Sequence, residues 1–129
     1  MVTPRRDNEV KARVLAEQLM RINRASYADG RYEVAYHVLG AALHCAEELV
    51  DLEMAVAVQQ RAESQQAELD SRVPPHPLST EGAARRGTHA LFSSLGRTAN
   101  SARARIKAQL AQSHARSVRH RHLPSSEIP

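Results

Sequence analysis

The sequence predicts an all-α protein, in which an elongated antiparallel helical hairpin is joined by a third helical segment that folds back to give a bundle of three to four helices. Composition is the first observation behind this prediction. The 129 residues are 42% apolar but only 3% aromatic, so a core must be built from Leu, Val, Ile and Ala, which suit helix packing. The second observation is that apolar residues recur at spacings of three and four over most of the chain, the period of an amphipathic helix.

The first predicted helix starts at Thr3-Pro4 or at Asp7, because both places offer a capping oxygen, and it ends at Ala28. A turn follows at Asp29-Gly30, where glycine adopts the left-handed conformation without steric cost. Helical spacing predicts an interior face made of Ala12, Leu15, Leu19, Ile22 and Ser26.

Residues 31–70 are predicted to form one long helix or two nearly continuous helices, because this stretch has no proline and one glycine. A single helix of this length would span about 60 Å, which makes the molecule elongated, bent or frayed. The first half has an apolar arc wide enough for two neighbours: Ala35, Val38, Leu39, Ala42, Leu43, Ala46, Leu49 and Val50. The stripe then rotates, so the second half is expected to face another partner through Met54, Val58, Ala62 and Leu69.

Residues 73–78 contain three prolines and are predicted to be a stiff linker between an acidic helical hairpin, residues 1–72, and a basic helical segment, residues 79–118. Ser79 or Thr80 offers the next helix start. A glycine inside a helix costs about 1 kcal/mol relative to alanine, so a break is expected near Gly96. Residues 119–129 are predicted to be a disordered tail, because apolar content fades there. The apolar stripe of the basic segment consists of Leu91, Leu95, Ala99, Ala102, Ile106 and Leu110.

The turn after the first helix has a further sequence pattern. Residues 28–35 read Ala-Asp-Gly-Arg-Tyr-Glu-Val-Ala, and Ala42 follows seven residues after Ala35. The pattern resembles one tetratricopeptide-repeat hairpin, in which glycine makes the turn, tyrosine covers it and small residues let the helices approach. The resemblance covers about a quarter of the chain, around Leu19 to Ala46, and implies a scaffold for protein binding. The matching positions are Gly30, Tyr32, Ala35 and Ala42, whereas Asn23 and Ser26 depart from the family pattern. An ordinary antiparallel helix pair with a glycine turn accounts for the same residues.

Charge is distributed unevenly along the chain. Residues 1–72 hold nine Lys and Arg against twelve Asp and Glu, whereas residues 73–129 hold nine against two. Two interpretations stay open: the basic half packs on the acidic half, or it binds an external anionic partner such as nucleic acid. The candidate residues for an anionic partner are Arg97, Arg103, Arg105, Lys107, Arg116, Arg119 and Arg121. No aromatic residue is interleaved with them for base stacking.

No catalytic, metal or cofactor site is predicted from the sequence. Nucleophile elbows, phosphate loops and dinucleotide fingerprints are absent from it. His37 and His44 are two helical turns apart, about 10 Å along the axis, so both cannot bind one ion without ligands from another helix. A solvated polar face, shared with Glu33, explains them better. Cys45 is the single cysteine and is expected to be a protonated, buried small residue.

These observations lead to a non-enzymatic helical protein–protein interaction or adaptor module, reached mainly by elimination. The expected partner is another protein or a second copy of the chain, because the stripes of the second and third segments would be incompletely covered in a monomer. The alternative is a nucleic-acid-associated protein that uses the basic C-terminal half. No stretch is apolar enough to span a membrane, so the cytoplasm is the expected compartment.

Overall fold

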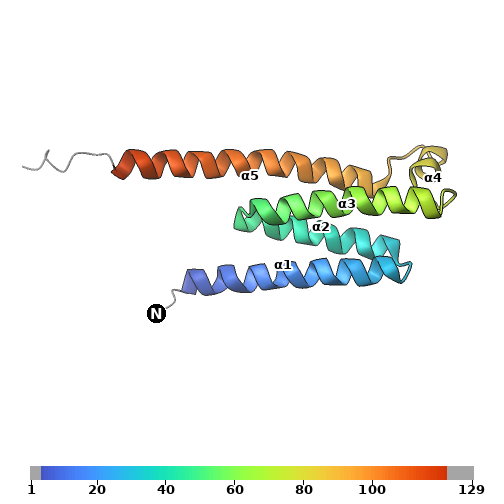
Figure 1. Ribbon diagram of the computed structural model, residues 1–129, viewed down its shortest axis with the longest axis horizontal. Coiled ribbons are helices and arrows are strands. Elements are labelled where there is room, and N and C mark those ends of the chain that lie inside the picture. Colours follow the sequence, from blue (N-terminus) through green and yellow to red (C-terminus); the bar gives the residue numbers. More distant parts are fainter. Residues whose placement is uncertain (1–3, 122–129) are drawn as a thin grey trace, which may run out of the picture.

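The computed structural model describes residues 4–121, and this part of the chain contains five helices and no strand (Figure 1). The all-α fold predicted from helical spacing is therefore confirmed. In chain order the helices are α1 (Pro4–Ala28), α2 (Tyr32–Leu49), α3 (Leu52–Arg72), α4 (Thr80–Arg85) and α5 (Leu91–Arg121).

The four long helices form an up-and-down bundle that is open at its edges. α1 packs mainly on α2 and α5 packs mainly on α3, while α2 and α3 contact each other in the middle (Figure 1). Within residues 4–121 the backbones of α1 and α5 lie apart, and the two helices meet through the rings of Tyr27 and Phe92, whose centroids are 6.1 Å apart. Each is therefore an edge helix with one face away from the core. The core is contributed by all four long helices, and its largest buried side chains are Phe92, Leu39, Leu69, Ile106 and Val58.

The turn between α1 and α2 forms as predicted at Gly30, which has a φ of 76°. The Arg31 N–H donates to the Ser26 carbonyl (2.9 Å) and the Gly30 N–H donates to the Tyr27 carbonyl (3.0 Å). These paired bonds satisfy the last carbonyls of α1 and are typical of a Schellman C-cap, which needs one left-handed residue. Glycine therefore sets the place where the chain first reverses.

A second reversal of the same kind separates α2 from α3. It corrects the prediction of one long helix or two nearly continuous helices over residues 31–70. Val50 has a φ of 52°, a value that β-branched residues rarely adopt. The Asp51 N–H donates to the Ala46 carbonyl (2.9 Å), and the Asp51 side chain accepts from the Met54 N–H (3.1 Å). One residue thus closes α2 and caps α3, and the two helices run antiparallel.

The interior face predicted for α1 is only partly right. Leu19 packs against the core, but the buried residues are Ala16, Met20 and Asn23, whereas Leu15 and Ile22 are 50% and 49% exposed. Small Ala16 allows α1 to lie close to the small residues of α2, and Leu15 and Ile22 turn outward. The faces predicted for the other long helices hold better: Ala35, Leu39, Val58, Ala62, Leu95 and Ile106 are all buried.

The third segment breaks at a different glycine from the one expected. α4 ends at Arg85 and is closed by Gly87, which has a φ of 70°, and Thr88 donates its N–H to the Ala83 carbonyl (2.9 Å). α5 instead continues through Gly96, where a Cβ would lie 3.3 Å from Cγ of Glu63. Gly96 therefore permits the close approach of α3 and α5, which offsets its low helix propensity.

The ends of the predicted segments differ in detail. Ser79 is the N-cap of α4, and its hydroxyl accepts from the Gly82 N–H (2.9 Å). The predicted linker at residues 73–78 separates α3 from α4, and its Val73 and Leu78 pack against the core. α5 includes residues 119–121 of the predicted tail, and residues 122–129 lie outside the described part of the chain.

Candidate interaction surfaces

A buried pair of side-chain amides joins α1 to α3. Asn23 is 0% exposed, and Gln65 is 5% exposed. Gln65 Nε2 donates to Asn23 Oδ1 (2.7 Å), and Asn23 Nδ2 donates to Gln65 Oε1 (3.1 Å) and to the Ala35 carbonyl of α2 (2.7 Å). The Arg61 guanidinium adds bonds to Asn23 Oδ1 (3.2 Å) and to the Met20 carbonyl (2.8 Å). Three helices are thus held by one amide pair.

Burial affects the ionisation of two groups beside this amide pair. The Tyr27 hydroxyl donates to the Gln65 carbonyl (2.9 Å). Loss of solvation, followed by the nearby negative charge of Glu68, raises the pKa of Tyr27 to about 12. Loss of solvation, followed by the positive charge of Arg24, lowers the pKa of Arg61. Among the described residues, every buried side-chain nitrogen and oxygen has a hydrogen-bond partner, so this polar cluster is satisfied.

The rotation of α1 that buries Asn23 leaves an apolar stripe on the outside. Val10, Val14, Leu15 and Ile22 are 56%, 46%, 50% and 49% exposed. On a helical projection, Val10 and Val14 lie opposite Ala16 and Asn23, whereas Leu15 and Ile22 lie on the flank, about 100° from these buried residues. Single exposed apolar residues are ordinary, but four on the outer half of one helix form a patch typical of a contact surface. We call this set, with the intervening Gln18, the α1 outer face.

The N-terminal part of α1 extends past the α2–α3 turn (Figure 1). Beside the turn, Arg13 forms an ion pair with Asp51 (3.7 Å between the nearest nitrogen and oxygen). A shallow hollow of about 340 Å³ lies beside Val10 and Val14 and is lined only by α1 residues. The sequence analysis missed these two valines, although their spacing of four places both on one face of the helix, which continues at Gln18.

The basic residues singled out from the sequence divide into two groups along α5. The first group lies beside the bundle. Arg103 donates to Gln59 Oε1 on α3 (2.7 Å) and Arg105 lies 3.9 Å from a Glu47 carboxylate oxygen on α2, whereas exposed Arg97 donates to Ser94 within α5 (3.2 Å). Two of these cations are thus directed toward acidic α2 and α3.

The second group lies on the part of α5 that extends beyond α2 and α3 (Figure 1). Residues 107–117 are all exposed, and residues 107–121 project about 22 Å at 1.5 Å per residue. This group contains Lys107, Arg116 and Arg119, which are exposed. The backbone of Arg121 ends α5, and its side chain is outside the described part. The structure does not gather these charges on one side of the helix.

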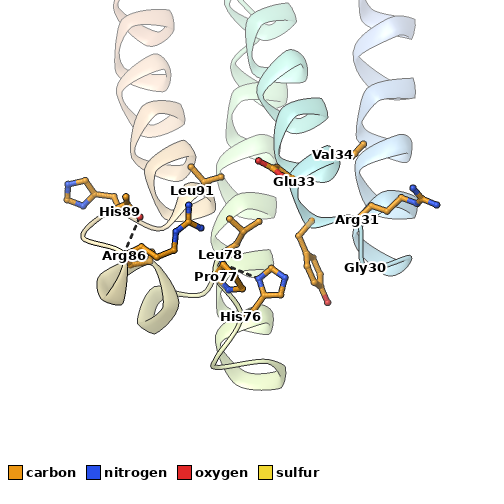
Figure 2. A pocket seen from close by; sticks show the side chains of 13 residues that line it. Gly30, Arg31, Glu33, Val34, His76, Pro77, Leu78, Arg86, His89 and Leu91 are labelled. Atoms are coloured by element: carbon orange, nitrogen blue, oxygen red, sulfur yellow. Dashed lines mark hydrogen bonds between the residues drawn. The ribbon is translucent and has the colours of Figure 1, made fainter.

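A larger hollow of about 750 Å³ lies at the opposite end of the bundle, between the start of α2 and the α4–α5 connection (Figure 2). Figure 2 shows Arg86 extending toward Leu91, whereas Arg31 and His89 point away from the centre. Arg31 is paired with Asp29 (2.7 Å). The wall is mixed in charge, and within it the Tyr32 ring packs edge-on against the His76 ring, with centroids 5.0 Å apart.

At the same end of the bundle, a second set of hydrogen bonds is centred on the Asp70 carboxylate. Its carboxylate accepts from the Thr80 N–H (2.7 Å), the Thr80 hydroxyl (2.6 Å) and Gln66 Nε2 (3.0 Å). Burial acts to raise the pKa of Asp70, but these bonds outweigh it and lower the pKa. Gln66 also donates to the Leu78 carbonyl (3.2 Å) and accepts from the Ser93 N–H (3.1 Å). The cluster therefore fixes the connection from α3 to α5.

The remaining candidates from the sequence stay apart from one another. His37 and His44 are exposed on α2, and in residues 4–121 no three His, Cys, Asp or Glu side chains form a group suited to a metal ion. Cys45 is half-buried, and loss of solvation followed by the charge of Glu48 raises the pKa of its thiol. The thiol is therefore less readily ionised than a free cysteine.

Replacing the central amide should destabilise the bundle strongly. We expect Asn23→Ala to lower the free energy of unfolding by about 2–4 kcal/mol, because it leaves Gln65 and Arg61 short of buried partners. Urea unfolding monitored by circular dichroism measures this change. Exposed Ser64 provides the control, since Ser64→Ala should change the value by less than about 0.5 kcal/mol. Equal losses in both variants would contradict the role given to Asn23.

One tyrosine should lose its phenolic proton at an unusually high pH. Of the three tyrosines, Tyr27 should form tyrosinate near pH 12 in the folded protein. Because its pKa is raised on folding, the neutral phenol contributes stability that is complete below about pH 10 and is lost as the pH rises toward 12. Tyrosinate absorbance during a pH titration measures the step. Tyr27→Phe should remove the late step, whereas Tyr36→Phe should leave it in place.

Comparison with known proteins gives no relative for this arrangement: no family model, curated protein or solved structure matches the chain. No helix of the described part is both long and apolar enough to cross a membrane.

Proposed function

We propose that this chain is a non-enzymatic helical module for protein–protein interaction and that the α1 outer face is its contact surface. The observation that carries the proposal is the set of four half-exposed aliphatic residues on a helix that already has its own buried face. Burying apolar area contributes about 25 cal/mol per Å², so covering this face by a partner is favourable.

The position of α1 supports the proposal. It is an edge helix that contacts α5 only through its inner side, at Tyr27 and Phe92 among the described residues, so a partner can reach its outer face along the described length. The side-chain hydrogen bonds of Asn23 fix the orientation of α1 on the bundle. Val10 and Val14 are therefore presented on a rigid surface. A rigid surface loses little conformational entropy on binding.

The resemblance to one tetratricopeptide-repeat hairpin supports the same class of function. Gly30 occupies the turn, Tyr32 packs edge-on against Tyr27 with ring centroids 5.0 Å apart, and Ala35 and Ala42 are 0% exposed. Hairpins of that family bind peptides or partner helices. A role as an adaptor in the cytoplasm also suits a chain with one cysteine.

The second candidate is binding of nucleic acid by α5. It is favoured by the projecting part of this helix, which carries basic residues and no acidic residue. This candidate predicts binding to mixed-sequence duplex DNA or RNA at low salt. Replacing Lys107, Arg116 and Arg119 together by Gln should then reduce the salt slope by about 3, near one unit per lost phosphate contact. Absence of binding at low salt would remove this candidate.

The leading proposal is tested by capture with the full chain. Val14→Glu places a charge in the middle of the α1 outer face, away from the core, and should abolish capture of the partner. Ser64→Glu, on the exposed side of α3, should leave capture unchanged. Circular dichroism verifies that both variants are folded. If the same proteins are captured equally by all three chains, the α1 outer face is not the contact surface.

A further inference from the structure

We propose that the α1 outer face binds a second copy of itself, with the two α1 helices antiparallel and centred on Val14. The inference rests on the proposed function, because it names the partner of the same surface. It follows from the order of charged and apolar residues along that face.

Five residues of α1 occupy one strip of the outer face. At 100° per residue, Asp7, Val10, Val14, Gln18 and Arg21 fall within an arc of about 80°. Their spacings are three, four, four and three, so the strip is symmetric in position about its central valine. All five are exposed.

Because of this symmetry, the strip is complementary to itself when two copies meet antiparallel across a two-fold axis. The axis then passes beside Val14, and each residue faces the one equally distant on the other side of Val14 in the second copy. Val14 meets Val14, and Val10 lies against the aliphatic part of Gln18. Asp7 of each copy meets Arg21 of the other, which gives two ion pairs of opposite charge.

The same strip disfavours other ways of pairing with itself. A parallel arrangement in register would place Asp7 beside Asp7 and Arg21 beside Arg21, where like charges repel. Leu15 and Ile22 lie along one side of the strip and are half exposed, so antiparallel pairing also brings the two Leu15 side chains near the axis. The charges therefore select one direction, and the aliphatic residues supply the buried area.

The fold leaves room for this contact. The strip around Val14 is exposed, and the contact of α1 with α5 is made from the inner side of the helix through Tyr27, so docking requires no change in the bundle. The hollow beside Val10 and Val14 gives a side chain of the second copy a place to enter. A contact through one helix per copy is expected to bury less than about 1,200 Å², so the dimer should be weak and depend on concentration.

Sedimentation equilibrium of the full chain over a range of concentrations tests the proposal. The unchanged chain should show a monomer–dimer equilibrium, and Val14→Glu should abolish the dimer. Asp7→Arg and Arg21→Asp should each weaken it, by about tenfold, because each single change opposes like charges across the contact. The double variant, Asp7→Arg with Arg21→Asp, should restore dimerisation.

Restoration by the double variant is specific to self-pairing. Both changes lie in one chain, so the two ion pairs form again only when the partner is another copy with the same changes. Ser64→Glu is the control and should dimerise like the unchanged chain. A chain that stays monomeric at every concentration, or a double variant weaker than either single variant, would overturn the dimer. Capture of another protein that still depends on Val14 would leave the proposed function standing.

Discussion

The bonds between Asn23 and Gln65 determine how the first helix lies on the others. A buried amide needs partners, and this pair is satisfied with Asn23 turned toward α3 and its second donor on the Ala35 carbonyl. With Asn23 inside, the helical period places Val14 on the opposite side and leaves Leu15 and Ile22 on the flank. The polar contact in the interior therefore accompanies the rotation of α1 that exposes these aliphatic residues.

The chain reverses at three left-handed residues, each of which closes a helix with paired backbone hydrogen bonds. Two of them are glycines, Gly30 and Gly87, which adopt this conformation without steric cost. The third is Val50, which is partly buried against the core and is followed by the helix-capping Asp51. Packing of α3 back on α2 compensates for the unfavourable backbone conformation of a β-branched residue. The open bundle depends on all three turns.

The two edge helices differ in the surface that they offer. α1 presents aliphatic residues bordered by charges of both signs, whereas the projecting part of α5 presents positive charge alone. The first surface is the one that we propose to bind a protein, and the symmetric placement of Asp7 and Arg21 about Val14 is the basis for proposing a second copy as that partner. The second surface suits a diffuse anionic partner, because its charges surround the helix and no aromatic residue lies among them.

The amino-acid sequence by itself determined the fold class, the Gly30 turn and the stripes of α2, α3 and α5, because these follow from local conformation and helical period. It did not reveal the reversal at Val50, since a valine there carries no local signal for a left-handed conformation. The inner face of α1 was likewise decided by the tertiary structure. Hydrophobicity favoured burying Leu15 and Ile22, but the requirement to satisfy Asn23 and Gln65 together exists only once α1 and α3 are side by side.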